Sequence, residues 1–322
     1  MREETSKSPL VSIVLPTYNR AYIISGALQS VLNQIYHNFE IIVVDDGSTD
    51  NTEEIIRNVA CKDSRVKYFR NNENKGASGA RNVGINLAKG EFIAFQDDDD
   101  EWRSDKLVKQ VNLLQTLQEN FAVVYSGYYN IIDGEKIYIS LHDIYPYPRE
   151  GNGNIYNSLL KGNFVATSSI LVRKSALLDV GLFDENLPMS EDWELFIRLS
   201  KKYLFKFIDE PLHVAYYTPN SLGKQSGAKL DGALRYLIKK HIDDYSKDKK
   251  ALGSIYFLGG AQFIMNGEKK LALKYLLSAI KNDPFQPKFF KFLIAFIISL
   301  FSIGFLKQLI YLKRKFKRNI KW

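Results

Sequence analysis

Residues 40–50 read Glu-Ile-Ile-Val-Val-Asp-Asp-Gly-Ser-Thr-Asp, a run of four apolar residues that ends in two acids and a glycine. An uninterrupted β-branched run predicts a strand that is buried on both faces, which is typical of a parallel sheet. The acids that follow would lie at the carboxyl end of that strand, where ligands bind in open α/β sheets. This stretch therefore predicts both the fold class and the position of a site.

The same alternation of apolar runs and amphipathic stretches continues on both sides of residues 40–50. We expect strands at 11–15, 40–44, 65–69, 92–95, 122–125 and 169–172, and helices at 21–34, 52–60, 77–88, 105–117 and 193–202. This pattern predicts an α/β fold with a mostly parallel sheet and helices on both faces. Residues 130–160 are rich in turns and cannot be assigned to elements from their pattern.

A segment rich in glycine, serine and lysine, residues 219–227, indicates a domain boundary. We expect an α/β domain over residues 1–225 and an all-α extension over residues 226–322. Within the extension, residues 254–287 resemble one helical hairpin of the tetratricopeptide type. A single repeat cannot bury its own apolar face, so this hairpin must pack on another element.

The composition, 45% hydrophobic and 25% charged over 322 residues, is that of a globular protein. It excludes a disordered chain and a polytopic membrane protein. The single cysteine, Cys61, excludes an intramolecular disulfide and a cysteine-based zinc site. Residues 1–9 are charged and polar, unlike a secretory signal. These features predict a cytoplasmic location.

The formal net charge of +8 is concentrated at the end of the chain. Residues 307–322 contain no acid and hold Lys307, Lys313, Arg314, Lys315, Lys317, Arg318 and Lys321. The remainder is nearly neutral, so nucleic-acid binding is not expected. The uncharged run before this tail, residues 292–306, would reach ~22 Å as a helix, less than the ~30 Å hydrocarbon core. We expect residues 288–322 to attach peripherally to the inner face of the cell membrane; a true span and a soluble helix or subunit contact are the alternatives.

Two further acidic clusters lie at the ends of predicted elements. Residues 97–101, four aspartates and a glutamate, follow a strand, and Glu191 and Asp192 precede a helix. Crowded carboxylates at a strand end favour a hard divalent cation, Mg²⁺ or Mn²⁺, which completes its shell with water and substrate phosphates. The alternatives are a solvated acidic loop and two acids that stabilise a helix N-terminus. The glycine-rich segment 75–84 would suit either an anion or a purely structural turn.

Together, five motifs in register resemble the family 2 glycosyltransferases over residues 9–222. They are Pro16-Thr-Tyr-Asn-Arg20, Val44-Asp-Asp-Gly-Ser-Thr-Asp50, Gly79-Ala-Arg-Asn-Val-Gly84, Phe95-Gln-Asp-Asp-Asp-Asp100 with Trp102, and Glu191-Asp-Trp193. The resemblance implies a GT-A fold, a nucleotide-diphosphate sugar donor, a divalent cation and inversion at the anomeric carbon.

The resemblance also implies a role for individual donor-site residues. Pro16 and Thr17 would line the nucleotide pocket, Asp45 would hydrogen-bond the base, and Arg81 would lie near the nucleotide. In the DxD motif of the family, Asp99 would be the principal metal ligand and Asp97 the second, while Asp97 and Asp98 would lie near the ribose and the diphosphate.

Asp192 matches the general base of the family, and Glu191 and Trp193 would contact the acceptor. Displacement at an anomeric carbon does need a base for the acceptor hydroxyl and a charge that stabilises the departing diphosphate. The chain departs from the family at residues 216–219, Tyr-Tyr-Thr-Pro, where many members have Tyr-Arg-x-His. His213 is nearby but out of register, and we expect it to be structural.

These observations predict a metal-dependent inverting glycosyltransferase. It would use a glycan or lipid-linked acceptor in the synthesis of a cell-surface polysaccharide, lipopolysaccharide or glycoprotein glycan. A sugar nucleotidyltransferase and a non-catalytic scaffold that binds a nucleotide sugar are the alternatives.

Overall fold

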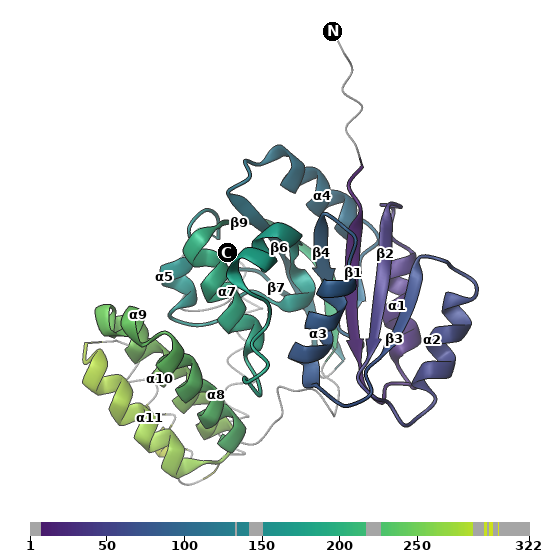
Figure 1. The fold of residues 1–322 in the computed structure, drawn as a ribbon. Helices are drawn as coiled ribbons and strands as arrows, with labels where there is room; N and C mark the ends of the chain where they lie inside the picture. The colour runs from purple at the N-terminus through teal and green to yellow at the C-terminus, as the bar shows by residue number, and fades with distance from the viewer. Residues whose placement is uncertain are drawn as a thin grey trace. The chain divides into compact units, whose positions relative to one another are not determined.

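The computed structural model describes residues 8–132, 134–141, 151–216, 227–285, 293, 294, 296–298 and 302 (Figure 1). The chain divides into two compact units, one formed by Met1–Leu159 with Asn163–Ser221 and the other by Leu160–Gly162 with Leu222–Trp322. The predicted boundary at residues 225 and 226 lies between the last strand of the first unit and the first helix of the second, outside the described residues.

The first unit is built on one nine-stranded sheet, in the order β3-β2-β1-β4-β8-β6-β9-β5 with β7 added to β6. The strands are β1 (Val11–Thr17), β2 (Phe39–Asp45), β3 (Val66–Arg70), β4 (Phe92–Phe95), β5 (Glu101–Trp102), β6 (Phe121–Ile132), β7 (Glu135–Ile139), β8 (Leu171–Arg173) and β9 (Leu204–Tyr216). Parallel ladders join β1 to β2 and β4, β2 to β3, and β6 to β9, whereas β5, β7 and β8 pair antiparallel. The predicted α/β architecture is confirmed, with parallel pairing throughout β3-β2-β1-β4 and a mixed remainder of the sheet.

Helices cover both faces of this sheet (Figure 1). They are α1 (Ile24–Leu32), α2 (Thr52–Ala60), α3 (Gly76–Leu87), α4 (Lys106–Thr116), α5 (Tyr156–Leu159), α6 (Lys174–Val180) and α7 (Glu191–Lys202). Ile13 and Leu15 of β1 join one core cluster with residues of α1, α2 and α4. Val14 faces the opposite side, where a Cβ built on Gly84 of α3 would lie 2.4 Å from its Cγ1. The glycine therefore allows α3 to lie directly against the sheet.

The strand pairing beyond residue 121 differs from the prediction. The strand expected at 122–125 extends to Ile132 as β6, and β9 was not expected. The ladder between them shifts register around Gly127, which is opposite Pro211. Because proline lacks the N–H that a regular ladder needs, it is accommodated at such an irregularity. Because the glycine and the proline interrupt the strand pattern, the pattern alone does not predict strands of this length.

The second unit is helical, with α8 (Gly227–Lys240), α9 (Ile242–Lys247), α10 (Lys249–Met265) and α11 (Lys269–Asn282). The helical hairpin expected at 254–287 corresponds to α10 and α11; its assignment to the tetratricopeptide class stays a prediction. A Cβ on Gly259 of α10 would lie 2.6 Å from Leu234 and 2.8 Å from Tyr275, so α10 packs closely between α8 and α11 (Figure 1). Within the described part of the chain, no helix has the length and apolar character needed to cross a membrane. Most of the tail at 288–322 lies outside that part.

Candidate active site

The carboxyl ends of β1 and β2 lie side by side and hold the first two motifs. Thr17 and Asp45 are register partners at the ends of these strands, and the Asp46 N–H donates to the Thr17 carbonyl oxygen at 2.9 Å. Alongside β1, the Gln96 N–H at the end of β4 donates to the Val14 carbonyl at 3.0 Å. The ends of three neighbouring parallel strands therefore bring together the segments that begin at residues 16, 45 and 96.

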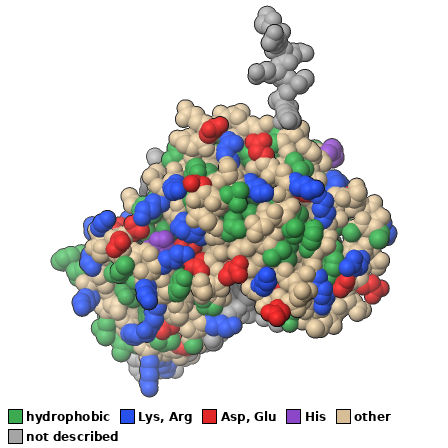
Figure 2. Space-filling model, in the orientation of Figure 1, with side chains coloured by type: hydrophobic (Ala, Val, Ile, Leu, Met, Phe, Trp, Pro, Cys, Tyr) green, Lys and Arg blue, Asp and Glu red, His purple; other side chains and the backbone are tan. Residues whose placement is uncertain are grey.

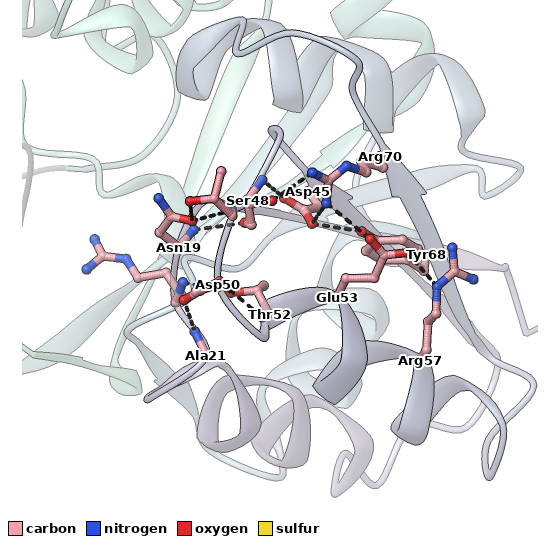
Figure 3. A network of polar contacts seen from close by, with 12 residues as sticks. Asn19, Ala21, Asp45, Ser48, Asp50, Thr52, Glu53, Arg57, Tyr68 and Arg70 are labelled. Atoms are coloured by element: carbon pink, nitrogen blue, oxygen red, sulfur yellow. Dashed lines mark hydrogen bonds and ion pairs between the residues drawn. The ribbon is translucent and has the colours of Figure 1, made fainter.

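Asp45 is fully buried, and both oxygens of its carboxylate accept hydrogen bonds (Figure 3). Oδ1 accepts from the Ser48 N–H at 2.7 Å, and Oδ2 accepts from the Tyr68 hydroxyl at 2.7 Å and lies 3.4 Å from an Arg70 nitrogen. Burial, then Asp45, raises the pKa of Tyr68, so this hydroxyl stays protonated and donates. Asp45 thus fixes the turn after β2 against β3, and its contact with a base stays a prediction.

The turn after β1 is bonded to the turn after β2, as Figure 3 shows. Asn19 has a left-handed backbone with φ 53°, which asparagine tolerates better than most residues. Its N–H donates to the Ser48 hydroxyl at 2.8 Å, and its side-chain oxygen accepts from the Thr49 N–H at 2.7 Å. The carboxylate of Asp50 accepts from the Ala21 N–H at 3.1 Å. The turns that follow β1 and β2 are therefore joined to one another by hydrogen bonds.

The N-terminus of α3 is already occupied by a carboxylate of the chain. Asp46 accepts hydrogen bonds from the N–H groups of Lys75 and Gly76, at 2.9 and 2.8 Å, and from the Asn71 side chain at 2.8 Å. Of the two alternatives for the glycine-rich segment 75–84, the structure favours the structural turn at its start. Asp46, one of the two acids after the strand but without a role of its own in the sequence analysis, is the residue that accepts the hydrogen bonds of this turn.

The acidic loop after β4 holds its carboxylates in different environments. Asp97, with a side chain 34% exposed, accepts from Arg81 at 2.9 Å and from the Ser168 hydroxyl at 3.0 Å. Burial raises the pKa of Asp98 to about 7, against the opposing effect of Arg20, whose Nε lies 3.3 Å away, and of the Thr17 hydroxyl.

Asp100, like Asp98, is a buried acid of this loop. Burial first, and then the charges of Asp97 and Asp99, hold the pKa of Asp100 well above its usual range. Its Oδ1 accepts from the Tyr216 N–H at 3.3 Å. The carboxyl groups of the loop are therefore crowded at the end of β4, and a bound cation would reduce the repulsion between them.

These acids suit a hard divalent cation that is shared with a substrate. Among residues 8–132, 134–141, 151–216, 227–285 and the few described beyond them, no three His, Cys, Asp or Glu side chains form a ready-made metal cage. Mg²⁺ or Mn²⁺ needs no such cage when it binds through one or two carboxylates and substrate phosphates. Asp99 and Asp97, both partly accessible, would hold the ion.

Arg81 connects the acidic loop to the start of α7, although the two are far apart in the sequence. Its guanidinium donates to Asp97 at 2.9 Å and to Glu191 at 2.7 Å, and its side chain is only 6% exposed. The charges of the two carboxylates outweigh burial and raise the pKa of Arg81. Arg81 is therefore a permanent cation that fixes the relative position of the loop and the helix.

Asp192, beside Glu191, is held by three donors. Its Oδ1 accepts from the Trp193 N–H at 2.7 Å, and its Oδ2 accepts from Asn163 at 3.1 Å and Thr167 at 3.3 Å. Burial, then the charge of Glu191, raises the pKa of Asp192 to about 6. The residue nevertheless remains partly accessible, so a substrate can reach it. A carboxylate with this pKa is deprotonated at neutral pH and basic enough to accept a proton.

The other two residues assigned to the acceptor have structural partners. Glu191 is the partner of Arg81, and Trp193 is buried with its indole N–H donating to the Leu159 carbonyl at 2.6 Å. Any contact of theirs with an acceptor stays a prediction. His213 is buried and stacks on Tyr128 with ring centroids 5.0 Å apart; burial, then Lys106, lowers its pKa to about 3. This environment agrees with the structural role that the sequence predicts for it.

Three polar residues of the site were missed by the sequence analysis. Asn163 and Thr167 bind Asp192, and Ser168 binds Asp97. All lie between α5 and β8, in a segment with little regular structure. The one available signal was the run Thr167-Ser-Ser169, three adjacent hydroxyls next to an apolar strand. Buried hydroxyls need partners, and here the partners are the acids of the site.

The fold is the GT-A fold of glycosyltransferases. Over 85% of this chain and 81% of the other, it superposes on Staphylococcus aureus TarS 1–349 with a TM-score of 0.63 and 20% identity. It also matches the mannosyltransferase PcManGT from Pyrobaculum calidifontis, solved with GDP-Man and Mn²⁺, with a TM-score of 0.60 and 18% identity over 91% of this chain and 81% of the other.

Residues 12–183 match the model of Glycosyl transferase family 2, and the chain belongs to this family. It is 35% identical to the Escherichia coli UDP-Glc:alpha-D-GlcNAc-diphosphoundecaprenol beta-1,3-glucosyltransferase WfaP over 60% of this chain and 71% of that protein. An uncharacterized glycosyltransferase of Haemophilus influenzae is 38% identical over 52% of this chain, and one of Rickettsia felis is 29% identical over 93%. The chain spans 64% and 42% of the lengths of these two relatives.

Proposed function

We propose that this chain is a metal-dependent, inverting glycosyltransferase that moves a sugar from a nucleotide-diphosphate donor to a glycan or lipid-linked acceptor. The observation that carries the proposal is the pairing of two acidic centres through one buried cation. Arg81 joins Asp97 of the acidic loop to Glu191, the neighbour of Asp192. The proposed reaction needs one centre for the donor diphosphate and one for the acceptor hydroxyl, held at a fixed separation.

On the donor side, we assign the nucleotide pocket to Pro16, Thr17, Asp45 and Arg81, with Asp97 and Asp98 near the ribose and diphosphate. Asp99 and Asp97 would hold Mn²⁺ or Mg²⁺, which when bound neutralises charge on the departing diphosphate. PcManGT was solved with GDP-Man and Mn²⁺, and TarS 1–349 with UDP-GlcNAc, which supports a nucleotide-sugar donor.

On the acceptor side, Asp192 would remove the proton from the attacking hydroxyl. The acceptor oxygen forms a bond to the anomeric carbon as the bond from that carbon to the diphosphate oxygen breaks. The proton goes to the Asp192 carboxylate and the electron pair to the diphosphate. A single displacement inverts the configuration and needs no carboxylate nucleophile in the chain. Glu191 and Trp193 would help to shape the acceptor side.

A lipid-linked acceptor is supported by the name of the E. coli relative, which contains alpha-D-GlcNAc-diphosphoundecaprenol. Such an acceptor would place the enzyme in the synthesis of a cell-surface polysaccharide. It would also give a purpose to the apolar and basic residues 288–322, which we propose attach the protein peripherally to the inner face of the cell membrane.

The test of this function is a screen of nucleotide sugars with Mn²⁺ and with EDTA, in which release of nucleotide diphosphate and transfer to a diphospholipid-linked sugar are both measured. We expect metal-dependent turnover with one donor. Consumption of a nucleotide triphosphate with a sugar phosphate would instead identify a nucleotidyltransferase, and binding without turnover a scaffold.

Asn163 offers a test of how Asp192 is tuned. Asn163→Ala removes a donor from the carboxylate, which favours the protonated form and raises the pKa of Asp192. Because the base acts deprotonated, the acid limb of kcat/KM against pH, which reports the free enzyme, should move from about pH 6 to about one unit higher.

The matched control for this substitution is Asn58→Ala, at an exposed position of α2, which should leave the profile unchanged. Thr167→Ser retains the hydroxyl donor to Asp192 and should also leave the limb in place. An Asn163→Ala enzyme that is slower at every pH with an unmoved limb would show that Asn163 only supports the fold.

A further inference from the structure

Helix α11 is apolar on two faces, and among the described residues of the helical unit only one of these faces is buried. Its inner face consists of Ala272, Tyr275, Leu276 and Ala279, which are all buried. Tyr275 is central to this packing, with ring contacts to Tyr256 and Phe263 and a hydrogen bond of 2.7 Å to Asp231. The spacing of three and four residues is that of one helix face. This face explains why α11 folds onto α10.

The outer face carries a second apolar stripe with the same spacing. Leu273, Leu277 and Ile280 are 44%, 59% and 39% exposed, and Phe285 just beyond the helix is 92% exposed. Single exposed leucines are ordinary on protein surfaces, but a stripe along one helix indicates a partner. Beyond α11, Leu293, Ile294 and Ile297 are also 43–46% exposed. These three residues belong to the tail at 288–322 and are not part of the outer face of α11.

The charged residues within α11 are all of one sign. Helix α11 contains no acid, and Lys270, Lys274 and Lys281 lie next to the stripe at exposed positions. The charge of Lys274 acts on Asp231 of α8, but that acid is already bound to Arg235 at 2.8 Å and to Tyr275. Figure 2 shows hydrophobic and basic side chains next to one another along the edge of the helical unit.

We propose that the outer face of α11, formed by Leu273, Leu277, Ile280 and the adjacent lysines, docks on an anionic lipid surface. Apolar residues at one depth with lysines beside them are the pattern of helices that lie in the membrane interface. The lysines would bind lipid phosphates while the leucines enter the boundary with the acyl chains. This contact is separate from the tail at 288–322 and does not depend on the transferase chemistry.

An anionic surface fits this face better than a second copy of the chain does. In a twofold dimer, identical surfaces meet, so the lysines of α11 would lie close to the same lysines of the partner. Like charges across an interface oppose association. A membrane with anionic headgroups supplies the opposite charge and an apolar layer together. Two weak contacts, this face and the tail, would then act as one stronger attachment.

A fluorescent label tests the position of this face directly. We would label Leu277→Cys in a Cys61→Ser background with bimane, add vesicles of phosphatidylglycerol and phosphatidylcholine, and include nitroxide-labelled lipid. We expect quenching of the label at position 277. The control is Lys239→Cys in the same background, an exposed position of α8 outside the proposed face, whose label should stay bright. Protein that sediments with the vesicles while the label at 277 is not quenched would overturn the proposal.

Substitutions in the full-length chain measure how much the face contributes. Leu273→Glu, Leu277→Glu and Ile280→Glu together should lower partitioning onto the anionic vesicles about tenfold or more. The control is Leu178→Glu, which changes a leucine that is 55% exposed on α6. A milder set of substitutions retains the leucines and should weaken binding to anionic vesicles only. It consists of Lys270→Gln, Lys274→Gln and Lys281→Gln. Its control is a set of three lysines outside α11, changed as Lys239→Gln, Lys247→Gln and Lys250→Gln.

The outcomes separate this proposal from the others. Metal-dependent release of nucleotide diphosphate should be the same in all these variants. If the transferase assay fails for the wild type, the proposed function is wrong, but the proposal that α11 binds lipid is unaffected. If both sets bind vesicles like the wild type, the tail alone attaches the protein and the proposal is wrong. If the glutamate set instead converts a dimer into monomers in light scattering, the face is an interface between copies, and the proposal is equally overturned.

Discussion

Asp192→Asn should lower kcat by about 10²–10⁴-fold, the usual contribution of general acid–base catalysis. The amide retains the shape of the carboxylate and can be held by the same neighbours, but it cannot take a proton from the acceptor. The wild-type carboxylate is suited to the task because burial and Glu191 raise its pKa to about 6. We expect steady-state assays with the natural acceptor to show the loss in kcat.

Donor affinity distinguishes a base from a binding residue. In the structure Asp192 contacts Asn163, Thr167 and the Trp193 N–H, and the link to the acidic loop passes through Glu191 and Arg81 instead. The Kd for nucleotide sugar should therefore stay within about twofold of the wild type. Asp179→Asn, at an exposed ion pair with Lys202, is the control and should leave kcat unchanged. An Asp192→Asn enzyme that loses donor affinity as steeply as turnover would contradict our assignment.

The sequence predicts the first half of the sheet well because local signals and tertiary structure agree there. The helix at Thr52–Ala60 and the strand at Phe92–Phe95 have the predicted bounds. β1, β2 and β4 of this half are short, mostly buried runs, and each is followed by a polar turn. Such runs carry their own boundary signals.

The sequence does not predict the pairing of β6 with β9, because that ladder is held by contacts between distant residues. Gly127 and Pro211 read as turn residues, yet in the structure they face one another at a shift of register. Here the pairing of the two strands overrides the preference of glycine and proline for turns. Neither residue signals by itself that its strand continues.

In the candidate site, too, the sequence predicts the residue types but not the contacts between distant residues. Acids after strands could be recognised by their position in the sequence, and their family roles by resemblance. The pairing of Arg81 with Glu191 joins residues that are 110 positions apart, and only the fold brings them together. The same holds for Asn163, whose side chain is unremarkable until Asp192 lies 3.1 Å away.

Asp99→Ala should abolish the metal-dependent binding of the donor and leave the fold intact. Asp99 is partly accessible, and its charge raises the pKa of Asp98 and Asp100. Removing it relieves repulsion in the acidic loop, so the metal-free variant should be at least as stable as the metal-free wild type. In the wild type, a donor at about one hundred times its Kd stabilises the folded state by about 2.7 kcal/mol. Thermal unfolding with Mn²⁺ and nucleotide should show this stabilisation, and the variant should lose it.

Glu101→Ala is the matched control for Asp99→Ala, since it removes a nearby exposed acid, the first residue of β5, directly after the acidic loop. Glu101 accepts from the Tyr216 hydroxyl at 3.1 Å, away from the pair of aspartates that we assign to the metal. This variant should retain the Mn²⁺-dependent shift, which separates the loss of one ligand from the loss of negative charge in general. Full activity of the EDTA-treated wild type would refute the metal role itself. In that case the charge on the leaving diphosphate would have to be stabilised by the fixed cations near the loop, of which Arg20 and Arg81 already lie 3.3 Å from Asp98 and 2.9 Å from Asp97.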